Sequence, residues 1–318
     1  MQEVSVVIPN YNGVAYLDGV LSSLECQTWK DFEVILVDNG STDGSTAFVS
    51  AHFPWVHIIE LPENFGFSRA VNEGIQASRA PYVLLLNNDT EVEKNFVEEM
   101  WAGIHRHKNA LACAAKMVQF NNRDVLDDAG NFYCALGWAF ARGKGKDIHA
   151  YDREGQIFAA CAGAAIYRRK ILDRVGYFDE EHFAYLEDLD VGYRARILGY
   201  ENWYCPKAVV YHVGSGTSGS RYNHFKTRYS SRNNVYMIYK NMPFLQLLLN
   251  LPFLLVGFGI KILFFTMKGM GREYLAGIRN GFQISRREKK VPFHAENLVN
   301  YVKIQLALWA GLFRRLVG

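Results

Sequence analysis

Two groups of acidic and amide residues stand far apart in this chain of 318 residues. Glu187, Asp188 and Asp190 precede a segment with apolar residues at helical spacing, and Asn-Asn-Asp at 87–89 follows the apolar run 82–86. A strand that ends in a carboxylate delivers it to the carboxyl edge of a sheet, where open α/β folds bind their ligands. The group at 87–89 suits a metal ion, and the group at 187–190 suits a proton transfer. Together they predict an active site.

The elements that must position these groups follow a repeating order from residue 4 to residue 86. Short β-branched runs predict strands and helical apolar spacing predicts helices, in the order strand 4–8, helix 15–24, strand 34–37, helix 45–52, strand 56–59, helix 68–77 and strand 82–86. This alternation builds a parallel sheet with helices on both faces. The strand runs are continuously apolar, as strands covered on both sides require. We expect an α/β fold with a mostly parallel central sheet.

Beyond residue 89 the pattern loosens. It predicts, in order, a helix near 93–105, a strand near 111–118, a hairpin within 125–138, a strand at 157–166, a helix at 189–198, a strand ending at His212 and a helix at 224–239. The charged, glycine-rich segment 142–147 is either a lid or a solvated turn, and we favour the turn. The basic, aromatic run 221–234 either binds phosphates or is a solvated helix face with buried aromatics.

Charge is distributed unevenly along the chain. Residues 241–318 hold 11 Lys and Arg against 3 Asp and Glu, a net of +8, so the first 240 residues hold 24 against 29, a net of −5. The basic part also contains 243–260, which carries no charged residue. Basic and apolar composition together favour an anionic membrane surface, whereas nucleic acid would favour a basic and polar one. We therefore divide the chain into a catalytic domain, 1–240, and a helical membrane-associating region, 241–318.

The cysteines and the first residues indicate the compartment. The five cysteines are odd in number and scattered, with no Cys-x-x-Cys pair, and we expect reduced core residues. A strand is predicted from residue 4, which leaves no room for a signal peptide ahead of it. We expect a cytoplasmic protein. The oligomeric state is left open.

Polar turns follow the first and second predicted strands. The first strand ends in Pro9, Asn10 and Tyr11, and the second ends in Asp38 and Asn39. The glycine-rich loops of dinucleotide-binding and P-loop folds are absent from these positions. A carboxylate there can accept from a pyrimidine N3 or a ribose hydroxyl, and Tyr11 can stack on a base. Ordinary turn and helix-capping chemistry is the alternative.

Taken in order, the motifs make the chain resemble the family 2 glycosyltransferases of the GT-A fold. The resemblance is greatest to the bacterial rhamnosyltransferase-like enzymes of cell-surface polysaccharide assembly, and it spans residues 4–241. It is carried by Val-Ile-Pro-Asn-Tyr-Asn at 7–12, Val-Asp-Asn-Gly-Ser-Thr-Asp-Gly-Ser at 37–45, Asn-Phe-Gly-Phe at 64–67 with Arg69 and Asn72, Asn-Asn-Asp at 87–89, Gly-Tyr-Phe-Asp-Glu at 176–180 and Tyr-Leu-Glu-Asp at 185–188.

The resemblance implies a nucleotide-diphosphate sugar donor and assigns residues to it. The donor-binding residues would be Pro9, Tyr11, Asp38, Asn39, Arg69, Asn87 and Asn88. The first three would hold the nucleoside, and Arg69 would face the diphosphate. Asp89 stands where the last residue of the family's Asp-x-Asp motif is expected and would bind Mg²⁺ or Mn²⁺. Asn87 replaces the first Asp, so waters and phosphate oxygens must complete the metal shell.

The same resemblance assigns the remaining site residues. His212 is similar to a late histidine that contacts metal or phosphate, although a lone His at a strand end is commonly structural. Asp188 matches the general base of the family's Glu-Asp motif, with Glu187 and Asp190 in support. Carboxylates at a helix N-terminus also favour the helix dipole without any substrate. An inverting transfer needs one carboxylate to take the proton of the acceptor hydroxyl.

Three functions follow from these residues. The first is an inverting, non-processive glycosyltransferase that acts on a lipid-linked or glycan acceptor at the inner face of the plasma membrane. Its first-choice donor is dTDP-rhamnose, ahead of a UDP-hexose or a UDP-N-acetylhexosamine. A sugar-phosphate nucleotidyltransferase would open with a glycine-rich basic loop in place of residues 9–13. A non-catalytic nucleotide-binding scaffold would not need Asp89 and Asp188.

The C-terminal region allows three relations to a membrane. Residues 243–265 are long enough to span a bilayer, but Gln246, Asn250 and Pro252 interrupt them. The apolar spacing of 298–313, with basic residues at 314 and 315, is typical of a helix that lies in the interface. An ordinary helical cap on the catalytic domain is the third option. We favour peripheral attachment.

Overall fold

The computed structural model describes residues 2–214 and 222–317, so residue 221 of the basic run lies outside the described residues. The strands are β1 (Val4–Asn10), β2 (Phe32–Asn39), β3 (His57–Leu61), β4 (Tyr82–Leu86), β5 (Thr90–Val92), β6 (Ala110–Gln119), β7 (Asn122–Asp128), β8 (Asn131–Cys134), β9 (Trp138–Ala141), β10 (Gly155–Ile157), β11 (Ala164–Arg168) and β12 (Glu201–His212). The main sheet has the order β10-β12-β6-β11-β4-β1-β2-β3, with β5 and β7 at its side, and β8 and β9 form a hairpin.

Ten α-helices accompany these strands in the described part of the chain. They are α1 (Val14–Glu25), α2 (Ser45–His52), α3 (Phe67–Ala77), α4 (Phe96–Arg106), α5 (Arg169–Val175), α6 (Glu187–Ile197), α7 (His224–Asn241), α8 (Phe244–Met267), α9 (Gly271–Ser285) and α10 (Leu298–Val317). Short 3-10 helices occupy Ile148–Tyr151, Glu180–His182 and Ala295–Asn297.

The α/β fold expected from the sequence is present, with a parallel portion and a mixed one. Strands β4, β1, β2 and β3 are parallel neighbours, as predicted. Strand β11 runs antiparallel to β4 and β6, whereas β12 is parallel to β6. Each face of the sheet has its own apolar core. Val6 and Ile8 of β1 pack with α1, α2 and α4, and Val7 packs with α3 and the elements that follow.

Some expected elements differ from the structure. The strand predicted at 157–166 is wrong: β10 ends at Ile157, β11 begins at Ala164, and the buried residues between them form a loop that bonds to Asn131. The apolar run indicates only that these residues are buried, and a buried loop can be as apolar as a buried strand. Segment 142–147 is a hydrogen-bonded turn, as favoured. All five cysteines are free, but Cys26 is exposed and is not a core residue.

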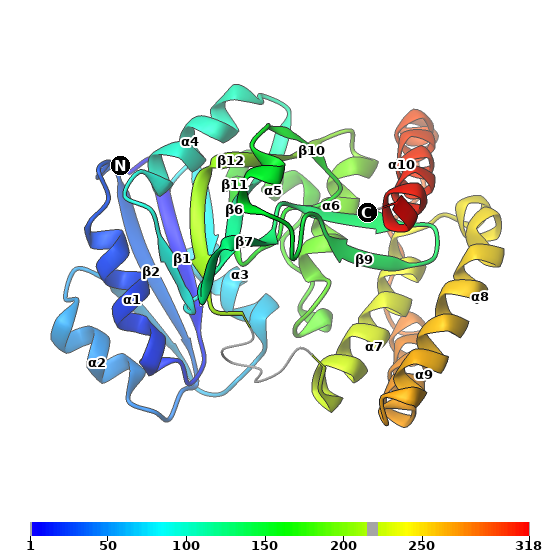
Figure 1. Cartoon of the computed structure of the whole chain (residues 1–318), viewed down its shortest axis with the longest axis horizontal. Coiled ribbons are helices and arrows are strands. Elements are labelled where there is room, and N and C mark those ends of the chain that lie inside the picture. Colours follow the sequence, from blue (N-terminus) through cyan, green and yellow to red (C-terminus); the bar gives the residue numbers. More distant parts are fainter. Residues whose placement is uncertain (1, 215–221, 318) are drawn as a thin grey trace.

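Helices α7 to α10 gather beyond one end of the sheet (Figure 1). Helix α8 joins α10 through a reciprocal amide pair, in which Asn250 Nδ2 donates to Gln305 Oε1 at 2.7 Å and Gln305 Nε2 donates to Asn250 Oδ1 at 2.9 Å. Gly257 brings α8 so close to the turn after β8 that a Cβ there would lie 2.0 Å from the Leu136 carbonyl oxygen. The amide pair therefore holds α8 against α10, the close approach at Gly257 holds it against the β8–β9 hairpin, and many apolar residues on its other side stay exposed.

Candidate active site

The carboxyl ends of β1, β2 and β4 meet in a hydrogen-bonded polar edge. Asn10 Nδ2 donates to Asp38 Oδ1 at 2.9 Å, and Asn88 Nδ2 donates to Asn10 Oδ1 at 2.7 Å. The other Asp38 oxygen accepts from the Ser41 backbone N–H at 2.9 Å. Asn10, Asp38 and Asn88 are all buried, so each polar group needs a partner of this kind. Asn10, which the sequence interpretation did not select, connects the three strand ends.

The other predicted donor residues except Arg69 lie at the same edge. Pro9 and Tyr11 flank Asn10 and are partly buried. Asn39 Oδ1 accepts from the Phe65 N–H at 3.0 Å, which ties the end of β2 to the loop before α3. The Asn87 N–H donates to the Gly163 carbonyl at 2.8 Å, and this bond brings the loop before β11 to the end of β4.

Arg69 has a different environment. It lies on α3 with a side chain that is 46% exposed, and it forms ion pairs with Glu180 at 3.1 Å and Glu73 at 2.5 Å. The hydrogen bond to Glu180, with the charges of both carboxylates, raises the pKa of Arg69. A diphosphate would compete with these two carboxylates for the guanidinium. Its role toward the donor stays a prediction.

Asp89 and His212 meet because of strand register. Asp89 lies between β4 and β5, and the antiparallel pairing of β5 with β12 sets Thr90 opposite His212. His212 Nε2 then lies 3.4 Å from Asp89 Oδ1. Both side chains are largely buried, at 14% and 7% exposure. One carboxylate and one imidazole at this distance are a donor set that a divalent cation can share.

Asp127, near the end of β7, holds the other side of the histidine ring. His212 Nδ1 lies 2.8 Å from Asp127 Oδ2, and Lys144 forms an ion pair with the same carboxylate. Burial opposes a charge on His212, but hydrogen bonds to Asp127 and Asp89 prevail and raise its pKa to about 9. A metal-binding histidine commonly donates its second ring N–H to a carboxylate in this way. The sequence signal for Asp127 was the polar stretch 127–131, which was interpreted only as part of a hairpin.

Glu187 and Asp188 form the first turn of α6 and have no cationic partner among the described residues. Asp188 Oδ2 accepts from Asn131 Nδ2 at 3.2 Å and from the Ala162 N–H at 3.3 Å, and Oδ1 accepts from the Leu189 N–H at 2.7 Å. Burial raises the pKa of Asp188 to about 6. Burial and the charge of Asp188 raise the pKa of Glu187 to about 8. A carboxyl poised near neutral pH suits a general base.

The backbone ahead of these carboxylates is strained. Phe183, Tyr185 and Leu186 have φ of 59°, 74° and 67°, values that residues other than glycine seldom adopt. Asn233 of α7 holds this strained turn in place, because its Nδ2 lies 2.8 Å from the carbonyl oxygens of His182, Ala184 and Tyr185. Strain that surrounding structure maintains is typical of functional sites. Asn233 lies within the run 221–234, and the sequence assigned it no role.

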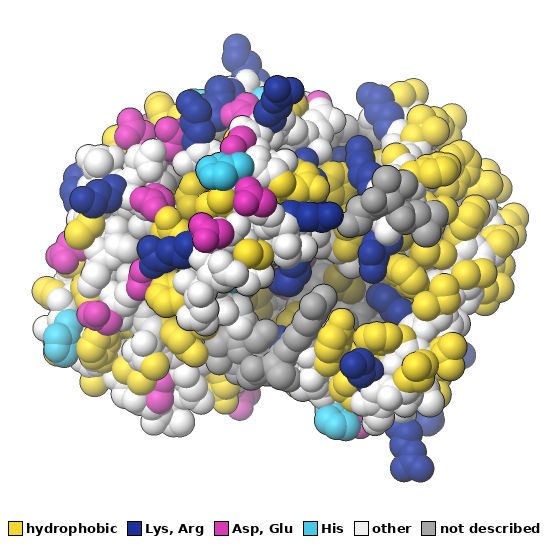
Figure 2. Space-filling view, viewed as in Figure 1, with side chains coloured by type: hydrophobic (Ala, Val, Ile, Leu, Met, Phe, Trp, Pro, Cys, Tyr) yellow, Lys and Arg dark blue, Asp and Glu magenta, His cyan; other side chains and the backbone are white. Residues whose placement is uncertain are grey.

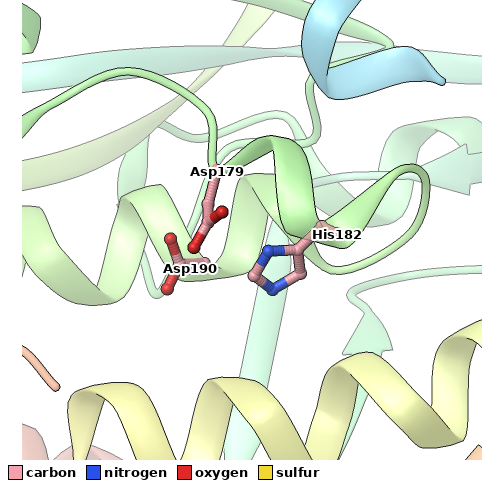
Figure 3. A group of neighbouring side chains, drawn as sticks. All are labelled: Asp179, His182 and Asp190. Carbon is pink, nitrogen blue, oxygen red and sulfur yellow. The ribbon is translucent and has the colours of Figure 1, made fainter. Parts of the chain in front are cut away.

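A second acidic cluster includes Asp190 of α6, and Figure 3 shows its members Asp179, His182 and Asp190 close together. These groups are close enough together to hold a metal ion. However, Lys240 Nζ lies 2.6 Å from Asp179 Oδ2 and 2.9 Å from Asp190 Oδ2, and Arg194 Nε lies 2.9 Å from Asp190 Oδ2. These cations already neutralise the carboxylates. Asp190 therefore has a structural role in this cluster, in place of the supporting role beside Asp188 that the sequence suggested.

Comparisons with known proteins agree with this fold. Residues 5–176 match the model of glycosyl transferase family 2. The chain is 26% identical over 237 residues to an N-acetylglucosaminyl-diphospho-decaprenol L-rhamnosyltransferase of Mycobacterium tuberculosis, covering 67% of this chain and 77% of that protein. It is 23% identical over 223 residues to a poly-beta-1,6-N-acetyl-D-glucosamine synthase of Staphylococcus epidermidis, covering 69% of this chain and 52% of that protein.

Solved structures show the same architecture. GalNAc-T7, determined with UDP, GalNAc and Mn²⁺, superposes with a TM-score of 0.61 at 16% identity, and the match covers 76% of this chain and 48% of that one. Residues 1–349 of S. aureus TarS superpose with a TM-score of 0.50 at 17% identity, covering 89% and 92%. The family match extends over more than half of the chain, and it carries the conclusion: this protein belongs to glycosyl transferase family 2 and is a glycosyltransferase.

Proposed function

We propose that the protein is an inverting, metal-dependent, non-processive glycosyltransferase of cell-envelope glycan synthesis. It moves a sugar from a nucleotide-diphosphate donor to a lipid-linked or glycan acceptor. The mycobacterial relative supports dTDP-rhamnose as the first-choice donor, with a UDP-hexose or UDP-N-acetylhexosamine next. The observation that carries the proposal is the buried Asp188 carboxylate, which accepts hydrogen bonds from neutral donors and directly follows a strained turn.

The residues divide the reaction between them. Pro9, Tyr11 and Asp38 bind the nucleoside at the polar strand edge. Asp188 is the general base and takes the proton of the acceptor hydroxyl. As that oxygen bonds to the anomeric carbon, the bond from this carbon to the diphosphate breaks and its electron pair leaves with the nucleoside diphosphate.

Asp89 and His212 are the residues that would hold the metal. Their carboxylate and imidazole, with phosphate oxygens and waters, fit Mg²⁺ or Mn²⁺, and the imidazole favours Mn²⁺ over Mg²⁺. The bound ion would offset the negative charge that develops on the departing diphosphate. Asp127 keeps the histidine ring oriented toward Asp89.

Donor turnover tests the proposal directly. The full chain is incubated with nucleotide sugars and Mg²⁺ or Mn²⁺, and release of nucleoside diphosphate is measured with and without chelator. We expect one donor to raise the melting temperature and to be turned over only with metal. Asp89→Ala should abolish metal-dependent donor binding while the fold survives. Turnover that persists in this variant or in excess chelator would refute the metal site, and donor binding without turnover under any condition would favour a scaffold.

We also propose that the enzyme lies on the cytoplasmic leaflet of the plasma membrane, attached by residues 241–318. Helix α8 is long and apolar enough to cross a membrane, with a mean hydropathy of 2.1 over a window that is 17% buried. Hydrophobic side chains cover the side of the molecule where α8 lies, and basic side chains border them (Figure 2). Because Asn250 and Gln305 tie α8 to α10, peripheral attachment is favoured over a spanning helix.

Flotation with anionic liposomes tests the attachment. Leu255 and Leu263 of α8 are 67% and 64% exposed, so Leu255→Glu with Leu263→Glu should release the protein from the liposomes. Trp55→Glu with Leu198→Glu, at sites 40% and 43% exposed within residues 1–240, adds the same charge and is the matched control. Equal flotation of the variant and the wild type would exclude this surface as the anchor.

A further inference from the structure

A large groove is lined by the β8–β9 hairpin, the turn that follows it and the C-terminal parts of α8 and α10. Its volume is about 1280 Å³, and the described residues that line it include no Asp or Glu. Its basic lining residues are Arg142, Lys144, Lys146, Lys261, Arg314 and Arg315. Its aromatic lining residues are Phe132, Trp138, Phe140, Tyr151, Tyr222, Phe264, Phe265 and Phe313. The groove therefore combines positive charge with apolar surface.

Most of this charge has no counter-ion. Of the six basic residues, only Lys144 forms an ion pair among the described residues, and its partner is Asp127. Arg142 Nη2 is buried and has no hydrogen-bond partner in the part of the chain that the structure describes. Lys261 Nζ lies 5.9 Å from the centre of the Trp138 ring, and Arg314 Cζ lies 4.5 Å from the centre of the Phe132 ring. Cations held by aromatic rings and lacking carboxylates favour an anionic ligand.

The groove leads to the candidate active site. Lys144 bonds to Asp127, which in turn holds His212. Arg142 Nε donates to the Ala129 carbonyl at 2.8 Å, two residues before Asn131, the amide donor to Asp188. A ligand in the groove would thus have one end near the proposed base. At the other side, α8 presents its exposed apolar residues.

We propose that this groove binds the acceptor as a phosphate-bearing lipid. The phosphate or diphosphate of the lipid is held by Arg142, Lys261 and Arg314. The aromatic side chains of α8 and the hairpin contact its hydrocarbon. The acceptor hydroxyl, which receives the sugar, reaches toward Asp188. The inference rests on the proposed glycosyl transfer and narrows its acceptor to a lipid-linked one. Nucleic acid also combines phosphates with flat rings, but the adjoining apolar surface of α8 favours a lipid.

Binding of a defined probe tests the groove without any donor. The full chain is titrated with a long-chain polyprenyl diphosphate in neutral detergent micelles. Lys261→Gln with Arg314→Gln should weaken binding at least roughly tenfold, since each removes a charge-assisted contact. Lys268, directly after α8, and Lys303, in α10, lie outside the groove lining. Lys268→Gln with Lys303→Gln removes the same charge and should bind like the wild type.

Other probes identify the ligand's source. The uncharged polyprenol, inorganic pyrophosphate and phosphatidylglycerol in the same micelles should each bind more weakly than the polyprenyl diphosphate and respond less to the groove variant. Equal binding of pyrophosphate or of an oligonucleotide would overturn the lipid assignment. Equal binding of wild type and groove variant would overturn the site. A normal donor-induced shift in melting temperature in the groove variant shows that the proposed function stands independently of this result.

Discussion

Two carboxylates of α6, Asp188 and Asp190, stand two residues apart and have opposite environments. Asp190 is fully buried, but its bonds to Arg194, Lys240 and Asn241 outweigh the burial and hold its pKa well below the usual range. Among the described residues, Asp188 accepts hydrogen bonds from neutral donors only, and burial raises its pKa to about 6. Positions two apart on a helix point to different sides, so the same acidic sequence serves two purposes.

The difference shows which carboxylate builds the fold and which is available for chemistry. A buried carboxylate that is paired with cations makes the folded state depend on those partners, because removing one of them leaves an uncompensated buried charge. An unpaired, buried carboxylate costs stability, and such perturbed groups cluster at functional sites. The strained turn at 183–186, held by Asn233, leads directly into the unpaired one.

The largest expected effect is a loss of stability when a cation is removed from the cluster around Asp179 and Asp190. Lys240→Met leaves Asp179 without its ammonium partner and Asp190 with Arg194 as its remaining cation, so the free energy of unfolding should fall by about 3 kcal/mol. Urea unfolding measures it, with Lys108→Met at an exposed site as the control. Adding Asp179→Asn should recover part of the loss, because it removes the carboxylate that Lys240→Met leaves without a cation. An unchanged midpoint in Lys240→Met would show that the two clusters do not differ as described.

Neutralising the unpaired carboxylate should act on catalysis instead. Asp188→Asn keeps the side-chain shape and removes the proton acceptor, so turnover should fall by roughly a factor of a hundred or more while donor affinity is kept. Steady-state kinetics and donor-induced melting shifts separate the two. Collapse of donor binding along with turnover would place Asp188 in the donor pocket.

Asn233, which holds the strained turn at 183–186, should contribute less to turnover than Asp188 does. Asn233→Ala removes the amide that contacts three carbonyl oxygens, so the turn relaxes and Asp188 moves. We expect turnover to fall by roughly tenfold through kcat, as for other positioning groups. Asn234→Ala, at the neighbouring buried amide that bonds to Gly137, is the control for general damage to α7. If both variants lose the same turnover, Asn233 has only a structural role.

The smallest expected effect is that of pH on the free energy of unfolding, which should differ in direction between the two groups of carboxylates. The raised pKa values of Asp188 (about 6) and Glu187 (about 8) mean that their stability contribution is greatest below their unfolded pKa values and is lost as pH rises through the folded ones. The lowered pKa of Asp190 acts oppositely, since its contribution is lost as pH falls below its unfolded value. Urea unfolding from about pH 5 to about pH 9 should show a decline in the wild type that Glu187→Gln with Asp188→Asn reduces. Identical slopes would contradict the raised pKa values.

Much of the catalytic fold was predictable because its signals are local. The first four strands and three helices are set by apolar runs and helical spacing, and Asn87, Asn88 and Asp89 follow directly from the end of β4. The strand at 157–166 failed because a buried loop is as apolar as a strand. Asn10, Asp127 and Asn131 were not selected, because their partners lie between 28 and 85 residues away in the chain.

In the C-terminal region, too, the sequence does not reveal which distant residues are partners. In the sequence, Gln246 and Asn250 interrupt an apolar segment. In the structure they face inward with Leu254 and Gly257, while many apolar residues of α8 face outward. Their inward direction depends on α10, which supplies the amide partner of Asn250.

The family, the parallel strands and the acidic motifs are readable from the chain alone, because periodicity and motif order are properties of neighbouring residues. Folding determines that Asp190 is neutralised while Asp188 has no cationic partner among the described residues, and that Arg142, Lys261 and Arg314 share one groove. Charge compensation depends on which side chains meet after folding, and residues distant in the chain supply the partners.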